Sequence, residues 1–405
     1  MLWVGVDTHL RMHRIEVQND LGDRMWRGQI SNDRKGFQDL LEKLKVARKS
    51  NSQEIGAVFM NPTANYHAPL KAFLESKEFR VILVDARISE HLRITNNLGK
   101  EKSDGADASI LASTARLMPK ILDRDSHERA SLSALTRLAE SIGKNITRVR
   151  NQIKSDVAAI FPEYPYYDEI DSKTSLDILE RYTTPEMLLD APISELSSLI
   201  DRASRHHYGM EEAEIIVEKA RESIGVPDSE NACSFRIRVN VARLREEKEA
   251  LKRVQKEVER RSAGNNDIEN ISDIKGIGTL SAACIVSEIG NMSQFSSALK
   301  LQSYGGKSPD ITGSAGKNYA TGVTKIRNPH LSNAVYESSV SLVLHRTPEF
   351  YEIFNREIRK GKKAPQAYIV VGKRLLYHVF SIMKNHKPYR QRLPREREGG
   401  ISSGA

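Results

Sequence analysis

The sequence predicts an α/β domain at the N-terminus followed by a mainly helical remainder. Three short β-rich segments open the chain, at residues 2–6, 13–17 and 24–30, with turn-forming residues between them. A heptad of apolar residues runs through the middle of the chain, and apolar residues at helical spacing return after residue 271. Because 405 residues exceed what one core of ordinary size holds, we assign these signals to separate domains.

The order of elements in residues 1–125 is that of an RNase H-like domain. The three β-rich segments predict an antiparallel meander, and a helix follows the capping cluster Ser31-Asn32-Asp33. A strand at 55–60, a helix at 70–74 and a strand at 81–84 come next, before one further helix. This βββαβαβ order with a final helix predicts a mixed sheet flanked by helices.

Residues 126–265 are expected to form a coiled-coil and helical linker region. Apolar residues alternate at spacings of three and four from 132 to 160, and a weaker seam occupies 237–258. The two seams could pair within one chain or between chains, or each could be the buried face of an ordinary helix. A smaller helical segment, 163–230, separates them.

Residues 266–388 are expected to form a mainly α domain with a helix-hairpin-helix-like segment. That segment reads Ile-Lys-Gly-Ile-Gly at 274–278 and leads into a helix. Gly276 and Gly278 allow backbone amides to approach a phosphate at a helix N-terminus, with Lys275 beside them. A plain glycine turn between two packed helices would have the same residues.

The chain is basic, with a net charge of +9 and a pI near 9.3. Lys and Arg gain affinity for a polyanion by releasing counterions from its phosphates, so nucleic acid is the leading candidate partner and binding should weaken steeply with salt. The alternative is that this charge serves solubility alone. The Arg-rich segment 389–405 is expected to be a disordered basic tail.

Composition also indicates the compartment. No run approaches the roughly 18 apolar residues of a membrane-spanning helix, and no leader precedes the first strand. Cys233 and Cys284 are far apart and lack metal-ligand spacing. We expect a soluble cytoplasmic protein with no membrane partner, disulfide or structural zinc.

Three acidic residues are candidates for a metal site. Asp7 ends the first strand, and Asp104 and Asp107 lie three apart on one face at the start of a helix. Carboxylate oxygens are the ligands that Mg²⁺ or Mn²⁺ prefers, and such ions promote phosphodiester displacement. Taken singly, each Asp would more often be a helix cap or a solvated charge than a metal ligand.

A fourth acid is expected at the end of the fourth strand, and Asn61 occupies that position. An amide oxygen can ligate Mg²⁺ but brings no negative charge. Metal affinity and catalysis should therefore both be weaker than with Glu.

A polar, glycine-rich segment at 304–317 is the candidate for a nucleophilic loop. A serine among cations could attack a phosphate, although most such loops are inert. The basic residues expected to contact nucleic acid in and after this segment are Lys307, Lys317, Lys325 and Arg327. We expect the segment from Lys307 to Lys317 to be mobile in the free protein.

Taken together, these motifs resemble the DEDD transposases of IS110-type insertion sequences, a family that includes the Piv invertases. The resemblance covers most of the chain. Residue 61 begins Asn-Pro-Thr-Ala-Asn-Tyr where the family has Glu-Pro-Thr-Gly-x-Tyr. The other motifs are Gly-Val-Asp at 5–7, Lys-Ser-Asp-Gly-Ala-Asp-Ala at 102–108, and the segments 274–278, 288–295 and 309–325.

The resemblance implies an RNase H/RuvC-like domain, a coiled coil and a C-terminal transposase domain, in a prokaryotic protein associated with the nucleoid. It implies a metal site of Asp7, Asn61, Asp104 and Asp107, and it makes Ser314 the residue that links covalently to DNA, with Thr312 and Ser308 as neighbours if the alignment shifts. The resemblance further implies that the protein binds donor DNA, target DNA and a structured guide RNA. It also implies assembly as a homodimer or tetramer, in which the serine of one protomer meets the acids of another.

Two alternatives remain beside this recombinase reading. Asn61 is compatible with a weakened or inactive scaffold that only binds nucleic acid. A structure-selective junction nuclease would use the acidic site without Ser314.

Overall fold

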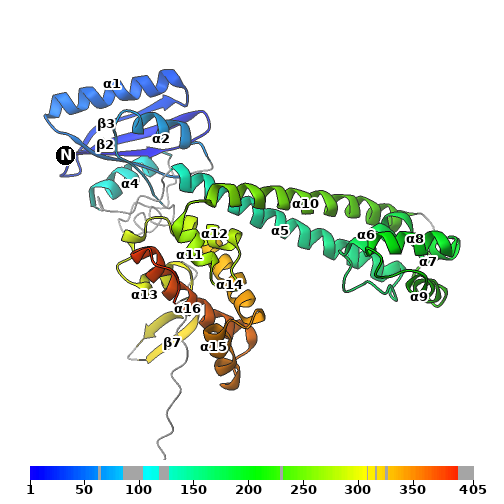
Figure 1. The fold of residues 1–405 in the computed structure, drawn as a ribbon. Helices are drawn as coiled ribbons and strands as arrows, with labels where there is room; N and C mark the ends of the chain where they lie inside the picture. The colour runs from blue at the N-terminus through cyan, green and yellow to red at the C-terminus, as the bar shows by residue number, and fades with distance from the viewer. Residues whose placement is uncertain are drawn as a thin grey trace, which may run out of the picture. The chain divides into compact units, whose positions relative to one another are not determined.

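The chain divides into two compact units, which are described separately (Figure 1). The first comprises residues 1–130 and 290–296, and the second residues 131–289 and 297–405. The regions that the sequence analysis separates at residue 265 thus share one unit. The computed structural model describes residues 1–62, 65–84, 104–117, 127–228, 231–307, 309–314, 317–323 and 327–390, so most of the expected tail at 389–405 lies outside the described residues.

The first unit is built on a mixed five-stranded sheet. Its strands are β1 (Leu2–Asp7), β2 (Met12–Gln18), β3 (Arg24–Ser31), β4 (Ile55–Met60) and β5 (Val81–Leu83). The strand order is β3-β2-β1-β4-β5, in which β1 is antiparallel to β2 and parallel to β4. The predicted α/β class, the antiparallel meander and the mixed sheet are confirmed.

Helices cover both faces of this sheet. They are α1 (Arg34–Asn51), α2 (Ala68–Glu75) and α4 (Asp104–Leu117). Leu40 of α1 and Leu70 of α2 pack with Val4 and Val6 in one core. On the other face, Trp3 packs with α4 residues. The alternation of strand residues between the two cores follows from the two-residue period of a strand.

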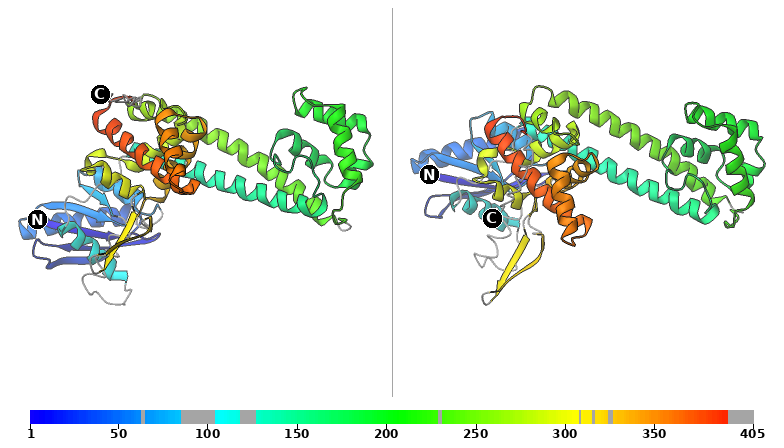
Figure 2. Two further views of the ribbon diagram at one scale, coloured as in Figure 1. Left: turned by 90° about the horizontal axis from the view of Figure 1, so that it is seen from below. Right: turned by 60° about the horizontal axis from the view of Figure 1, so that its bottom comes forward.

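The second unit contains a long pair of helices, α5 (His127–Ile160) and α10 (Ala232–Ser262), which lie side by side in both Figure 1 and Figure 2. Arg236 Nη2 pairs with Asp156 Oδ1 at 2.6 Å, while Arg261 donates to Ser131 at the opposite ends. The helices are therefore antiparallel. Their seams share one core, so the two heptad patterns, whose pairing the sequence left open, pair within one chain.

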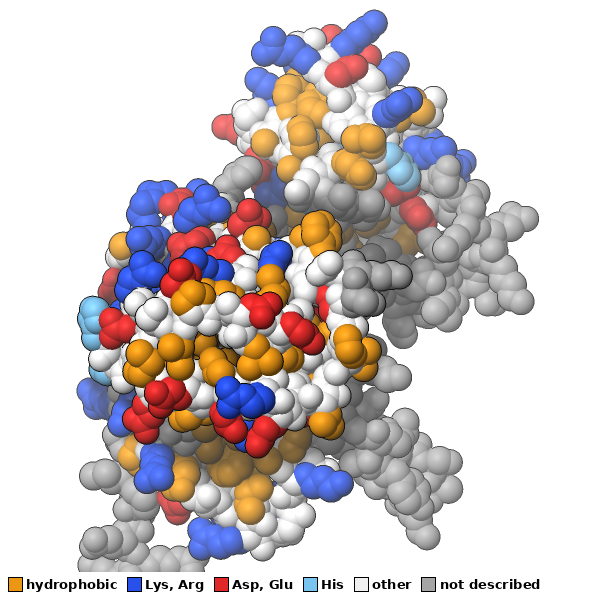
Figure 3. All heavy atoms as spheres, turned by 90° about the vertical axis from the view of Figure 1, so that its right-hand side faces the viewer, with side chains coloured by type: hydrophobic (Ala, Val, Ile, Leu, Met, Phe, Trp, Pro, Cys, Tyr) orange, Lys and Arg blue, Asp and Glu red, His pale blue; other side chains and the backbone are white. Residues whose placement is uncertain are grey.

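Four short helices connect the far ends of this pair. They are α6 (Lys173–Arg181), α7 (Pro185–Leu189), α8 (Ile193–Ala203) and α9 (Met210–Arg221). We call this region the arm tip. Hydrophobic side chains gather on its surface (Figure 3). The exposed members of α7, α8, α9 and the intervening loop are Leu189, Ile193, Tyr208, Met210 and Ile215.

The rest of the second unit is a helical cluster. Its helices are α11 (Asn266–Ser272), α12 (Thr279–Ile289), α13 (Ala298–Tyr304), α14 (Pro329–Leu344), α15 (Pro348–Arg359) and α16 (Ala364–Asn385). The short 3-10 helix η1 (Met292–Gln294) falls in the segment grouped with the first unit. Among the described residues, no helix is long and apolar enough to cross a membrane.

The expected glycine-rich loop differs from the structure. It forms an antiparallel pair of strands, β6 (Pro309–Ser314) and β7 (Lys317–Val323), with Ser314 paired to Lys317. Gly and Ser interrupt apolar alternation in this segment, so the usual sequence signal of a strand is missing.

Candidate active site

Asp7 and Asn61 stand at the same edge of the N-terminal sheet. β1 and β4 are parallel neighbours in which Val6 aligns with Met60, so the next residue of each lies at the carboxyl edge of the sheet. Asp7 is only 3 % exposed. A carboxylate buried to this extent needs hydrogen-bond donors.

Asn61 is one of these donors. Its Nδ2 donates to Asp7 Oδ1 at 2.8 Å, and its Oδ1 accepts from the backbone N–H of Thr8 at 2.8 Å. Because a backbone N–H can only donate, this second bond fixes which end of the amide faces Asp7. A Glu at position 61 would instead bring a second carboxylate toward Asp7, an arrangement that favours a bridging cation or proton.

Two histidines complete the edge, and the sequence analysis missed both. His9 Nε2 lies 2.9 Å from Asp7 Oδ2, and the His9 backbone N–H donates to His13 Nδ1 at 3.3 Å. His13 is fully buried, and burial lowers the pKa of its imidazole. The sequence signal that could have identified His9 was the run Asp-Thr-His at 7–9, which begins at the last residue of the first strand.

The N-terminus of α4 lies at this same edge. A Cβ on Gly5 would come within 2.1 Å of Ala108 O, so β1 and α4 touch through their backbones. Trp3, nearer the start of β1, packs with Leu111 and Ala115, nearer the end of α4. The helix therefore runs antiparallel to β1, and its first turn, which carries Asp104 and Asp107, is near Asp7.

The donor set at this edge fits Mg²⁺ or Mn²⁺ in part. Asp7 and the Asp residues of α4 offer the oxygen atoms that these ions prefer. Both oxygens of Asp7, however, already have protein partners in Asn61 and His9. Among the residues whose side chains the structure describes, which leave out Asp104, no three His, Cys, Asp or Glu form a ready metal cluster. Asn61 itself can ligate an ion through Oδ1 only if that atom gives up its bond from the Thr8 N–H or shares it with the ion.

The turn between α11 and α12 contains both glycines of the expected helix-hairpin-helix-like segment. Gly276 has a φ of +101°, a left-handed conformation that favours glycine, and Lys275 beside it is exposed. A Cβ on Gly278 would meet nothing within 4 Å, so the start of α12 is open to a ligand. This arrangement can present backbone N–H groups to a phosphate.

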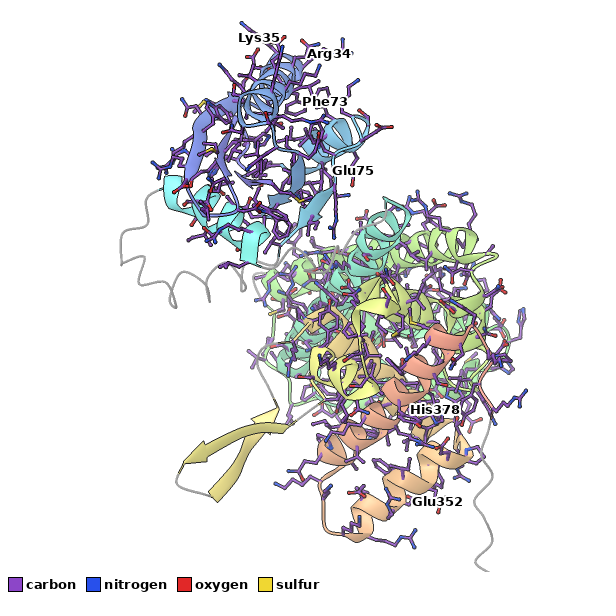
Figure 4. The ribbon with its side chains drawn as sticks, turned by 90° about the vertical axis from the view of Figure 1, so that its left-hand side faces the viewer. Arg34, Lys35, Phe73, Glu75, Glu352 and His378 are labelled. Carbon is purple, nitrogen blue, oxygen red and sulfur yellow. The ribbon has the colours of Figure 1, made fainter. Side chains whose placement is uncertain are left out.

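The hairpin carrying Ser314 stands away from the helices of its unit (Figure 4). The structure describes the backbone of Ser314 and Lys317 but not their side chains, and Lys325 lies outside the described residues. Ser314 belongs to the second unit and Asp7 to the first.

Lys307 lies in a buried position, not on an open surface. It is 4 % exposed, and its Nζ donates to Ser332 O at 3.1 Å. Arg327, on the other side of the hairpin in sequence, is half-buried. The two cations therefore flank the base of the hairpin.

A buried carboxylate, Glu288, holds the start of α14 beside this base. Arg137 binds both of its oxygens, at 2.6 and 3.0 Å, and Asn328 Nδ2 donates to Glu288 Oε2 at 2.7 Å. Asn328 also caps α14, and its backbone N–H donates to Tyr304 O. This network fixes where the chain re-enters the helices after the hairpin.

Comparisons with known proteins match segments of both units to transposase families. Residues 4–162 match the DEDD transposase family named for IS110, and residues 268–355 match the IS116/IS110/IS902 transposase family. A mini-circle transposase candidate for IS117 of Streptomyces coelicolor is 24 % identical over 82 % of both chains. A 42 kDa protein of the insertion element IS900 of Mycobacterium paratuberculosis is 25 % identical over 96 % of this chain and 97 % of its own length.

Proposed function

The chain belongs to the DEDD transposases of the IS110 family, and we propose that it cuts and rejoins DNA using the edge of its N-terminal sheet. One observation carries the proposal: Asp7, Asn61 and the first turn of α4 meet at that edge. Asp7, Asp104 and Asp107 would hold Mg²⁺ or Mn²⁺, with Asn61 as a neutral fourth ligand.

The proposed chemistry is a phosphoryl exchange. A bound divalent ion supplies polarisation of the scissile phosphate. Ser314 Oγ forms a new bond to phosphorus while the bond to the leaving DNA oxygen breaks, and the proton lost by Ser314 balances the one that the leaving oxygen gains. Because one phosphodiester replaces another, rejoining needs no further energy source. His9, held by Asp7, is placed to hold a proton at this edge.

We propose DNA as the substrate and a structured RNA as a guide. The basic excess of the chain, the open turn at Gly278 and the family membership support nucleic-acid contacts. Nucleic acid that co-purifies after gentle lysis would identify the RNA once it is sequenced.

We also propose assembly as a homodimer or tetramer. The heptad at 132–160 does not support this assembly, since its second half packs against α10 within the chain. The exposed hydrophobic side chains of the arm tip (Figure 3) supply the supporting observation.

A weakened or inactive derivative is the second candidate function. The hydrogen bond from Asn61 Nδ2 to Asp7 favours it, because an N–H donor occupies an oxygen that a metal would need. The junction-nuclease alternative keeps the metal site and lets water attack in place of Ser314.

The test is to trap a covalent intermediate. The protein, purified with its bound nucleic acid, is incubated with labelled DNA spanning the flanks of its gene in Mg²⁺ and then denatured. We expect label on the protein for the parent, more for Asn61→Glu, and none for Ser314→Ala in either background.

Thr321→Val, in β7 of the same hairpin, is the matched control and should keep the label. An adduct that survives Ser314→Ala would assign the nucleophile elsewhere. DNA cleavage without any adduct would support the junction nuclease.

A further inference from the structure

The turn between α15 and α16 carries a dense group of exposed cations. Residues 356–363 read Arg-Glu-Ile-Arg-Lys-Gly-Lys-Lys, so one carboxylate stands among five basic side chains. All five basic residues are exposed, and we call them the basic turn: Arg356, Arg359, Lys360, Lys362 and Lys363.

The carboxylate of this segment, Glu357, is buried and gathers three of the cations. It pairs with Arg356 Nε at 3.2 Å, Lys360 Nζ at 3.1 Å and Lys362 Nζ at 2.6 Å. Hydrogen bonds from the two lysines lower the pKa of Glu357 to about 2, so it stays ionised. Glu352, one turn earlier on α15, is also exposed (Figure 4). Five basic and two acidic side chains over residues 352–363 leave an excess of three positive charges.

The helix that follows the basic turn adds to this positive potential. α16 is 22 residues long and begins directly after Lys363, so the partial positive charge of its peptide dipoles lies at the turn. Gly361 has a φ of +83°, and a Cβ there would meet nothing within 4 Å, so the backbone of the turn is open. An anion can therefore approach the side chains and the backbone of this turn together.

The basic turn lies beside the base of the β6–β7 hairpin. A pocket of about 270 Å³, where the end of α13 meets α14 and the start of α16, is lined by both Pro365 and Lys307. Pro365 comes two residues after the basic turn, and Lys307 comes two residues before β6. Tyr368 of α16 stacks on Phe354 of α15, with ring centroids 4.8 Å apart. Packing thus fixes the turn next to the segment that carries Ser314.

We propose that the basic turn binds the phosphate backbone of the DNA duplex on which Ser314 acts. This inference rests on the proposed function and adds an interaction surface to it. The six residues of β6 span about 20 Å, a length that about six base pairs cover, so DNA held at Ser314 reaches the hairpin base. This proximity favours DNA over RNA as the partner. Because phosphate contacts carry no sequence information directly, the affinity should not depend on the DNA sequence.

The experiment measures the affinity of two labelled DNA duplexes of unrelated sequence by fluorescence anisotropy at several NaCl concentrations, with a labelled RNA hairpin in a further arm. The variants are Arg359→Gln, Lys363→Gln and the double variant, which leave the three cations paired to Glu357 in place. The matched control combines Arg253→Gln and Lys256→Gln, which remove an exposed arginine and an exposed lysine from α10 and lower the net charge equally.

The double variant should bind both duplexes about tenfold more weakly than the parent and reduce the salt slope by about two. Each single variant should reduce the slope by about one, and the α10 control should lose less than about twofold in affinity. Should the double variant fail to fold, as checked by circular dichroism, Lys363→Gln alone decides.

A double variant that binds DNA as tightly as the α10 control would overturn the basic turn as an interface and leave the proposed function in place. A loss at one duplex only would contradict contacts to the backbone. If the loss were confined to the RNA arm, DNA would not be the partner of this turn. A parent protein that binds neither duplex would instead overturn the proposed function.

Discussion

The sheet edge around Asp7 and the pocket around Lys307 bury charge in opposite ways. At the sheet edge, a buried carboxylate is matched by donors from Asn61 and His9. In the pocket, Lys307 and Arg327 lie together without a carboxylate among the described lining residues. At the first site the buried charge has protein donors on both carboxylate oxygens, and at the second site two like charges lie side by side. A cation that binds at the first site therefore competes with protein donors for the Asp7 oxygens, whereas at the second site the two cations disfavour each other's charge.

The largest effect on stability is expected for a substitution at Gly5, where β1 contacts α4 beside the sheet edge. Gly5→Ala places a methyl group against the α4 backbone, so β1 and α4 must separate. We expect a loss of about 3 kcal/mol or more in the free energy of unfolding, measured by denaturant titration of the first unit's transition.

Gly143→Ala on α5 is the matched control, since a Cβ there meets nothing within 4 Å. It should stabilise the protein by up to about 1 kcal/mol, because Ala favours a helix more than Gly does. If both changes had equal effects, the close contact at Gly5 would not be what fixes the edge.

A smaller and pH-dependent effect on stability is expected for a substitution at Lys307. The pKa of Lys307 is about 8 in the folded protein, below the ordinary 10.5, so folding disfavours its charged form. The resulting cost is full below pH 8 and disappears as the pH rises toward 10.5. Lys307→Met should therefore raise the free energy of unfolding at pH 7, by on the order of 1 to 3 kcal/mol less the lost bond to Ser332.

The gain in the free energy of unfolding from Lys307→Met should be smaller at pH 10 than at pH 7. Urea titration at both pH values measures it, with Lys300→Met, at an exposed lysine on α13, as the reference. The charged group that faces Lys307 in the described pocket is Arg327, which stays protonated throughout. A destabilised Lys307→Met protein at pH 7 would show that the lysine is a structural contact and not a strained cation.

Much of the first unit could be predicted from the sequence. The strand at 55–60 has the same bounds in the structure, and the meander and helix order agree, because apolar periodicity and turn residues report directly on local structure. The placement of Asp7 beside residue 61 also follows, since parallel neighbouring strands share their carboxyl edge.

The remaining features depend on contacts between residues distant in sequence. Nothing local indicates that Asn61 donates to Asp7, or that His13 is buried next to the site. Lys307 reads as a surface cation in a basic segment, and its burial depends on Gly372, some 65 residues later. The pairing of the two long helices within one chain could not be predicted either, because periodicity identifies an apolar seam but not the helix that packs against it.

We propose that the edge around Asp7 is a metal-dependent cleavage site and that Asn61 weakens it. The most direct measurement is the rate of DNA cleavage as a function of Mg²⁺ concentration for the parent, for Asn61→Glu, and for Asn61→Glu combined with Asp7→Asn. We expect Asn61→Glu to cleave about tenfold faster or more and to saturate at lower Mg²⁺, because a charged ligand replaces a donor to Asp7. Adding Asp7→Asn should remove that gain, whereas an Asn61→Glu protein that cleaves no faster than the parent at any Mg²⁺ concentration would contradict the claim.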